Sequence, residues 1–184
     1  GKTRPRSDAG EDCRAFKAHG LAKCGCNGGQ NPVPPAGHGD HLQRHRQGFA
    51  TDRVAEVLAA YGFEETLVNI GEYRAGPTPM RIGIADIEGS VLEVTQLKSG
   101  ALATSSPDGL RFSDGSPHIR RTDGRNLPLR WRTVSVEAGT AAMADAYSTA
   151  LVLTPDTGLA ERLKSTGHVR SVLMQENTGE IWQI

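Results

Sequence analysis

Apolar residues in the segment 52–61 recur at the spacing of a helix. Their positions follow the i, i+3, i+4, i+7 pattern of one helical face, which predicts an amphipathic helix. Thr51 stands where a hydroxyl can cap the first turn, and Gly62 stands where a helix can stop. The apolar positions are Val54, Val57, Leu58 and Tyr61.

A second helix is predicted over residues 140–154, which read TAAMADAYSTALVLT, and the rest of the chain is organised around it. The stretch is rich in Ala and Leu, begins with the small polar Thr140 and is followed by Pro155, which cannot continue a helix. A shorter helix is expected over residues 158–164, ended by Gly167.

Runs of β-branched and apolar residues bounded by turn residues predict seven strands. The turn at 98–100 is expected to join its two flanking strands into a hairpin, and the turn at 176–179 to join the last two. Because strands follow one another with few helices between them, the fold class expected is α+β with a largely antiparallel sheet. The predicted strands are 65–70, 80–86, 91–97, 101–104, 132–136, 169–174 and 180–184.

Charge divides the chain into two parts. The 184 residues suffice for one domain with a real core, and 21 basic residues balance 21 acidic ones, so no bias towards nucleic acid or membranes is visible. Residues 1–47 hold eight basic and four acidic residues, which leaves 13 basic and 17 acidic in residues 48–184. The first stretch has few large apolar residues, so a disordered or loosely docked head is expected before an α+β domain at 48–184.

The head holds all three cysteines, Cys13, Cys24 and Cys26. An odd number of cysteines in a polar segment argues against a disulfide framework. A single Cys-x-Cys pair without a second pair does not match the ligand spacing of zinc sites. The basic residues lack aromatic neighbours that would stack bases, so nucleic acid is not an expected partner. No apolar run is long enough to span a bilayer, and no export signal is visible.

Asp145 and Thr149 lie four residues apart on the predicted helix 140–154. This spacing stacks a carboxylate and a hydroxyl on one face of a helix. Two such oxygen donors suit Mg²⁺ or Ca²⁺, with water or phosphate completing the coordination shell. The alternative is that Thr149 packs against the helix while Asp145 is merely solvated, as in many i, i+4 pairs.

Five stretches, taken in order, carry a resemblance to a known family. They read G-F-A-T-D (48–52), N-I-G-E-Y-R-A-G (69–76), G-A-L-A-T-S-S (100–106), S-P-H-I (116–119) and A-D-A-Y-S-T-A-L (144–151). The last four resemble the motifs N-x-G-G-D-I-x-x-x-G, G-A-x-A-T-S-G-D, S-H-I and D-A-L-A-T-A of the ApbE family, the FAD:protein FMN transferases. The resemblance covers residues 48–184, about the C-terminal half of a family member.

The resemblance implies transfer of FMN from FAD to a Ser or Thr hydroxyl of a target protein, with Mg²⁺ required and AMP released. Asp145 and Thr149 would ligate the Mg²⁺ (or Ca²⁺), together with Ser148, which stands where some relatives place a second carboxylate. His118 would be the general base, a task that suits an imidazole because its pKa lies near neutral pH. Ile119 would pack on the flavin.

Further residues of the family-like motifs are expected to line the FAD site. These are Asn69, Gly71, Thr104 and Ser105, and small hydroxylated residues after a strand serve equally well as turn formers. The acceptor implied is a flavoprotein subunit of a membrane redox complex. The resemblance also implies a periplasmic or inner-membrane-anchored location, and it leaves a homodimer open.

Several positions depart from the family pattern. Glu72 and Tyr73 stand in place of Gly-Asp, Gln47 in place of the motif lysine, and Arg44 in place of a backbone metal contact. Residues 42–47 replace the family's G-I-A-K-G. They can be encoded CTT CAA CGG CAT CGC CAA, and the same string read one base later encodes phenylalanine, asparagine, glycine, isoleucine, alanine and the start of a lysine codon. The hypothesis is that residues 1–47 are translated out of frame.

Three alternatives to a transferase follow from these departures. An inactive flavin-binding relic would bind FAD and leave it intact. A Mg²⁺-dependent FAD pyrophosphatase would release AMP and FMN without an acceptor. A plain interaction module would bind neither flavin nor metal.

Overall fold

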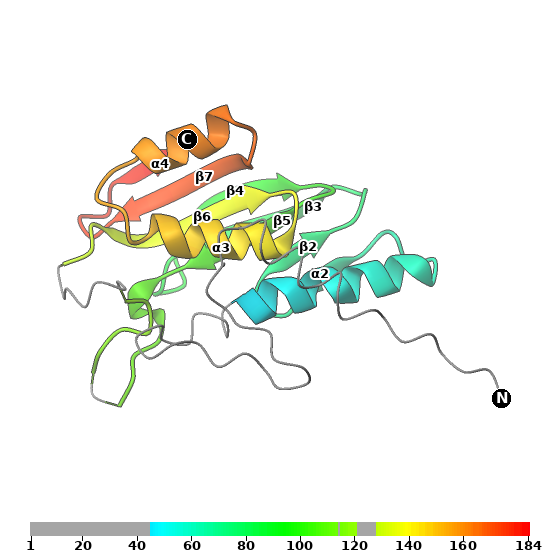
Figure 1. Ribbon diagram of the computed structural model, residues 1–184, viewed down its shortest axis with the longest axis horizontal. Helices are drawn as coiled ribbons and strands as arrows, with labels where there is room; N and C mark the ends of the chain where they lie inside the picture. Colours follow the sequence, from blue (N-terminus) through cyan, green and yellow to red (C-terminus); the bar gives the residue numbers. More distant parts are fainter. Residues whose placement is uncertain (1–44, 114, 121–127) are drawn as a thin grey trace, which may run out of the picture. The chain divides into compact units, whose positions relative to one another are not determined.

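The computed structural model describes residues 45–113, 115–120 and 128–184. These residues form a six-stranded antiparallel sheet, a separate two-stranded hairpin, three α-helices and a short 3-10 helix. Figure 1 shows how these elements are arranged. The predicted α+β class with a largely antiparallel sheet is confirmed. In spatial order the sheet contains β1 (Leu67–Asn69), β2 (Tyr73–Ala75), β5 (Ala101–Ser105), β6 (Trp131–Ala138), β7 (Val169–Glu176) and β8 (Ile181–Gln183). The hairpin contains β3 (Met80–Ala85) and β4 (Val91–Leu97). The helices are α2 (His45–Ala60), η2 (Pro107–Gly109), α3 (Ala141–Leu151) and α4 (Gly158–Ser165).

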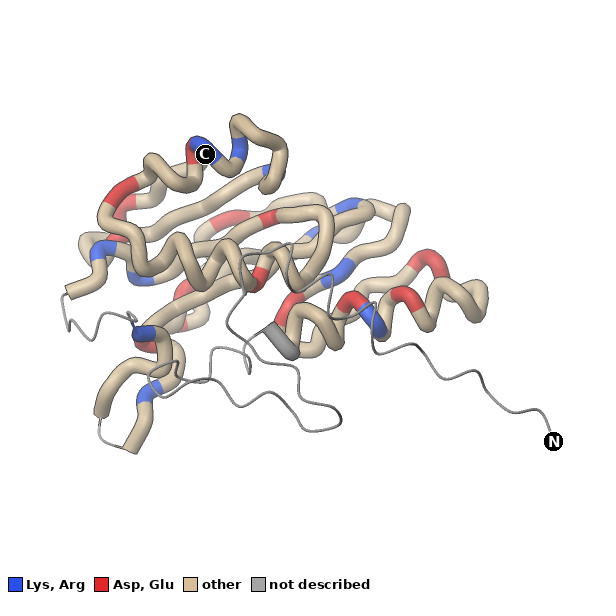
Figure 2. The backbone as a smooth tube through the Cα atoms, in the orientation of Figure 1, with Lys and Arg blue, Asp and Glu red and all other residues tan. Residues whose placement is uncertain are grey.

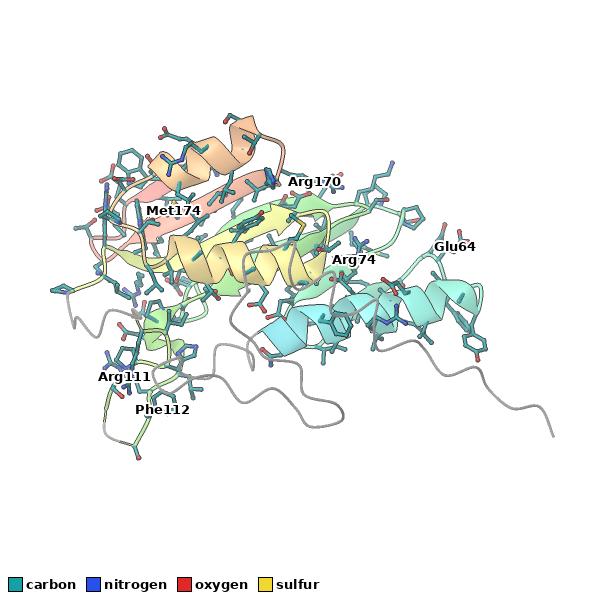
Figure 3. All side chains as sticks on the ribbon, in the orientation of Figure 1. Glu64, Arg74, Arg111, Phe112, Arg170 and Met174 are labelled. Atoms are coloured by element: carbon teal, nitrogen blue, oxygen red, sulfur yellow. The ribbon has the colours of Figure 1, made fainter. Side chains whose placement is uncertain are left out.

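The two faces of the six-stranded sheet are covered by different elements. Successive residues of a strand point to opposite faces. On β5, Ala101 and Ala103 pack with the alanines of α3, whereas Leu102 packs with the apolar residues of the β3–β4 hairpin. Side chains of β6 and β7 meet α3 and α4, and Met174, labelled in Figure 3, lies in this core. The helices therefore cover one face and the hairpin the other.

The largest core cluster lies between β6, β7, α3 and α4. Its fully buried members include Trp131, Leu151 and Met174. Removing a large apolar side chain of this kind from water stabilises a protein by about 1.5–3 kcal/mol. This cluster holds α3, the helix that carries Asp145 and Thr149, against the middle of the sheet.

Helix α2 packs against α3 through the side that carries Gly48 and Thr51, which corrects the face expected for it. Val57 is 50% exposed and Tyr61 is 79% exposed, so the predicted apolar stripe faces outward. Gly48 and Thr51 are buried instead, and a Cβ on Gly48 would lie 2.6 Å from the carbonyl oxygen of Ala141. Two helices approach this closely only where side chains are very small, which selects the Gly48–Thr51 side of α2 for the contact with α3.

The cap and the start of α2 also differ from expectation. The helix begins at His45, within the stretch predicted as head, so Thr51 lies inside the helix. Its hydroxyl donates a hydrogen bond to the carbonyl of Gln47, one turn earlier, at 2.9 Å. The end at Gly62 fits the sequence, since this glycine has φ +87°. The other predictions for residues 1–44, including the cysteines, Arg44 and the reading-frame hypothesis, fall outside the described residues.

The hairpin expected across residues 98–100 is wrong. Strand β4 pairs with β3, while β5 leaves for the large sheet and pairs with β2 and β6. The turn is attached to other segments: Ser99 N donates to Gly76 O at 2.8 Å, and Arg170 donates to the carbonyls of Lys98 and Ser99 at 2.8 Å each. These bonds from β7, whose Arg170 is labelled in Figure 3, hold the turn where the chain passes between the two sheets.

The remaining elements follow the sequence closely. Helix α3 begins after Thr140 as expected and ends at Leu151, three residues early, in a turn. The closing hairpin is confirmed as β7 and β8, and α4 lies where a short helix was predicted. Strand β2 and the 3-10 helix η2 were not predicted. In the part of the chain that the structure describes, no helix is long and apolar enough to cross a membrane. Figure 2 shows basic and acidic residues interspersed over these elements.

Candidate functional site

The first turn of α3 is fixed by two acceptors. Thr140 Oγ1 accepts a hydrogen bond from Met143 N at 3.2 Å, as an N-cap residue does. The Asp52 carboxylate of α2 accepts from Ala141 N at 2.8 Å and from Ala142 N at 2.9 Å. A negative charge at a helix N-terminus is favourable because of the helix dipole. Helix α2 therefore fixes the position of α3.

Asp52 also contacts the sheet. Its Oδ1 lies 3.3 Å from Nε of Arg74 on β2, a pair in which both side chains are mostly buried; Arg74 is labelled in Figure 3. One carboxylate thus joins α2, α3 and β2. These three elements surround the residues described next.

Alanines on both sides of the contact let α3 lie close to β5. Ala141 and Ala144 of the helix pack on Ala101 and Ala103 of the strand and on Ala138 of β6. This close packing brings the middle of α3 to the end of β5, where Thr104 and Ser105 stand. The predicted pair Asp145 and Thr149 lies at that point.

A cluster of hydroxyl groups joins the end of β5 to α3. Ser105 Oγ lies 2.8 Å from Ser148 Oγ and 3.1 Å from Thr149 Oγ1, and Ser148 Oγ donates to the carbonyl of Asp145 at 3.1 Å. Ser148 is fully buried and does not line the cavity described below. The Ser148 hydroxyl is engaged by Ser105 and by the helix backbone, and its role as a metal ligand stays a prediction.

A cavity of about 490 Å³ lies beside the end of β5. Six residues singled out from the sequence line it, although they come from three distant segments: Thr104, Ser105, His118, Ile119, Asp145 and Thr149. Gln47 of α2, Glu72 and Asp86 also line it. The geometric condition for joint action of the imidazole and the Asp145–Thr149 pair, a shared cavity, is therefore met.

The ring of His118 is oriented by backbone carbonyls. Its Nδ1 lies 2.8 Å from Leu110 O and 3.1 Å from Pro107 O. Because carbonyl oxygens only accept hydrogen bonds, Nδ1 carries the proton in the neutral ring, and Nε2 is the basic nitrogen. The Pro107 carbonyl belongs to the 3-10 helix η2 and the Leu110 carbonyl to the residue that follows it, so this short segment favours the Nδ1-protonated tautomer.

Ile119 occupies a less open position than its neighbour. It borders the cavity, but its side chain is 3% exposed and packs in the core cluster with Trp131 and Leu151. Contact between Ile119 and a flavin stays a prediction, limited to the small part of the side chain that reaches the cavity wall.

Asn69 and Gly71 lie outside the cavity lining. Asn69 Oδ1 accepts a hydrogen bond from Gly71 N at 3.2 Å, and Gly71 has φ +113°, a conformation that favours glycine. Together they shape the turn between β1 and β2. In the structure they lie in the turn that precedes Glu72, and their contact with the cofactor stays a prediction.

Glu72 is the lining residue that sequence reasoning overlooked as a functional group. It is only 8% exposed, and its Oε2 is buried without a hydrogen-bond partner. Burial, and secondarily the nearby Asp145 carboxylate, raise the pKa of Glu72 from 4.5 to about 7. The sequence signal that could have identified Glu72 is its position in the motif, where a charged residue stands instead of the family's glycine.

The oxygen donors at this cavity suit a hard divalent cation. Carboxylate and hydroxyl oxygens of Asp145 and Thr149 are the ligand types that Mg²⁺ and Ca²⁺ prefer. Among the residues that the structure describes, no three His, Cys, Asp or Glu residues gather to hold a metal by themselves. A cation here would therefore keep several waters or take phosphate oxygens into its shell, as Mg²⁺ commonly does.

Comparisons with known proteins agree on one family. The model of the ApbE family matches residues 44–173. The fold is similar to the ApbE protein of Thermotoga maritima (TM-score 0.67, 26% identity, 77% of this chain and 50% of that one) and to a protein named flavin transferase ApbE from Vibrio cholerae (TM-score 0.63, 25% identity, 100% and 62%). A flavinyl transferase ApbE from Pseudomonas stutzeri matches in fold, with TM-score 0.58 at 24% identity.

This chain matches only part of the length of these proteins. The chain spans 50% of the length of the Thermotoga protein and 62% of the length of the Vibrio protein. A comparison with curated proteins finds no match. Because the family model covers well over half of the 184 residues, and the fold agrees with it, the chain belongs to the ApbE family.

Proposed function

We propose that this chain carries out flavin transfer, moving FMN from FAD to a Ser or Thr hydroxyl of an acceptor protein and releasing AMP. The observation that carries the proposal is the shared cavity that unites His118 with the Asp145–Thr149 pair. Membership of the ApbE family and the likeness to a protein named flavin transferase support it.

In the proposed reaction, the acceptor hydroxyl oxygen attacks the phosphorus of the FMN half of FAD. The new P–O bond forms as the bond to the bridging pyrophosphate oxygen breaks, and AMP leaves with that electron pair. His118 Nε2 takes the hydroxyl proton, since the carbonyls of Leu110 and Pro107 keep the other ring proton on Nδ1. The Ser or Thr residue that carries the attacking hydroxyl belongs to the acceptor protein.

Asp145 and Thr149 are the residues that would hold Mg²⁺, and Ser105 positions the Thr149 hydroxyl for this task. When bound, Mg²⁺ supplies neutralisation of the negative charge on the pyrophosphate. A cavity of about 490 Å³ falls in the range of pockets for drug-sized ligands, about 300–1,000 Å³, which suits the reacting centre of FAD. We further propose that the acceptor is a flavoprotein subunit of a membrane redox complex and that the chain acts in the periplasm.

Mass spectrometry of an acceptor peptide tests the proposal. The peptide, taken from a flavinylated redox subunit, is incubated with the full chain, FAD and Mg²⁺, and a mass gain equal to FMN is expected. Asp145→Asn and His118→Asn should each abolish the gain. Asp156→Asn is the matched control, since Asp156 is exposed and its amide analogue can still accept from Gly158 N.

The same assay separates the alternatives. Release of AMP and FMN with an unmodified peptide would indicate a pyrophosphatase. Bound but intact FAD would indicate a flavin-binding relic. Either result contradicts the transferase.

A further inference from the structure

Glu72 enters the cavity from the turn between β1 and β2. Gly71 precedes it with φ +113°, and Tyr73 begins β2, so the backbone at this corner is fixed on both sides. From this position Glu72 lines the cavity, and its side chain is largely buried.

One oxygen of the Glu72 carboxylate, Oε2, lacks a hydrogen-bond partner. The exposed fraction of Glu72 is 8%, and Oε2 is buried. A buried polar atom left without a partner costs about 1–3 kcal/mol, and more if it is charged. A group of this kind, in a wall that already contains Asp145, indicates a missing positively charged or proton-donating partner.

We propose that Glu72 is an additional oxygen ligand, which together with Asp145 and Thr149 lets this cavity bind a divalent cation in the absence of nucleotide. The inference deepens the proposed function and rests on it, because it assigns a further ligand to the same cation. The cation would satisfy the buried oxygen of Glu72 and relieve its repulsion with Asp145.

Among the described residues, no group hydrogen-bonds to the buried Oε2 of Glu72. His118 uses Nδ1 on the carbonyls of Leu110 and Pro107, and Asp86 is an acid whose Oδ1 accepts from the amides of Glu88 and Ser90. Two carboxylates in one site carry a high cost when both are ionised, and a hard divalent cation reverses that cost. The unusual burial of Glu72 then has a chemical reason.

Titration of the full chain with Mn²⁺, without FAD, tests the proposal. Electron paramagnetic resonance counts the bound Mn²⁺, and calorimetry repeats the titration with Mg²⁺. We expect one site in the wild type, and a loss of affinity on the order of tenfold or more in Glu72→Gln and in Asp145→Asn. Glu65→Gln removes an exposed carboxylate that does not line the cavity and should leave the affinity unchanged.

Glu72→Gly, which restores the family's residue, is a second variant for the case in which the glutamine disturbs the fold. It should show the same loss of Mn²⁺ affinity. Circular dichroism and melting in a chelator check that each variant is folded. Weakened binding in the Glu72 and Asp145 variants, with the Glu65 control unchanged, supports the inference.

Two results would overturn it. If Asp145→Asn loses Mn²⁺ while both Glu72 variants bind like the wild type, Glu72 is not a ligand, and the metal pair of the proposed function stands. If the wild type binds no Mn²⁺ without nucleotide, the inference is wrong, and the peptide assay with FAD decides the proposed function separately.

Discussion

The buried carboxyl of Glu72 should make the stability of the metal-free protein fall as the pH rises. Its pKa is raised from 4.5 to about 7, so between these values the native state holds a proton that the unfolded chain has released. The contribution of Glu72 to the free energy of unfolding is therefore complete below about pH 4.5 and is lost as the pH rises through about 7. Replacing Glu72 with Gln removes this titration while keeping the shape of the side chain.

The magnitude follows from the size of the pKa shift. A shift from 4.5 to about 7 corresponds to about 3 kcal/mol, or about 1.4 kcal/mol per pH unit across the interval. The free energy of unfolding of Glu72→Gln, minus that of the wild type, should therefore increase by about 3 kcal/mol between pH 4.5 and pH 8. Above that range the difference should be constant, since Glu72 is then ionised in both states.

Urea unfolding at half-unit pH steps, in EDTA to exclude metal, measures this difference. Taking the difference between the two chains cancels the contributions of groups that do not interact with Glu72. Asp145→Asn provides a second comparison. Because burial is the larger cause of the raised pKa and Asp145 the smaller, the effect of Glu72→Gln in the Asp145→Asn background should keep more than half of its total change with pH.

A difference that does not change with pH would refute the reasoning. It would mean that Glu72 is hydrated or paired in solution and that the cavity does not enclose it. Disappearance of the whole slope in Asp145→Asn would also contradict it, because the repulsion between the two carboxylates would then exceed the effect of burial.

Two further substitutions test the contacts that build the site. Gly48→Ala would place a Cβ 2.6 Å from a carbonyl oxygen of α3, so we expect a loss of about 1–3 kcal/mol in urea unfolding. Gly139→Ala has nothing within 4 Å of its Cβ and should be near neutral; equal effects would contradict the close helix contact. Ser105→Ala removes the hydroxyl that lies 3.1 Å from Thr149 Oγ1 and 2.8 Å from the buried Ser148 Oγ, and we expect weaker Mn²⁺ binding with about 1–3 kcal/mol lost in stability; unchanged Mn²⁺ affinity would show that Thr149 needs no such support.

The sequence predicted best what local signals determine. Thr140 caps α3 through its own hydroxyl, and Asp145 and Thr149 lie one turn apart because helix geometry requires it. The meeting of His118 with that pair could not be worked out from spacing. It was expected only from the order of family motifs, since η2 and the loop that carries His118 were not predicted.

The features that the sequence did not predict depend on contacts between residues that are far apart in the chain. The turn 98–100 looks like a hairpin turn, but the bonds from Arg170 and to Gly76 redirect the chain to the other sheet. Likewise, the apolar stripe of α2 is the obvious face to bury, and only the proximity of α3 makes Gly48 the contact. The burial of Glu72 depends on β2, a strand too short to show a periodic pattern.

The hydrogen bonds of Asp52 to the first turn of α3 affect how a dinucleotide could be held. Helix N-termini often receive phosphate groups directly on their amides, but in α3 Asp52 and Thr140 already occupy the amides of the first three residues. Among the described residues that line the cavity there are three carboxylates and neither Lys nor Arg. A pyrophosphate would thus meet a wall of its own sign, and its retention should depend on the counter-charge supplied by a cation and vanish when a chelator removes it.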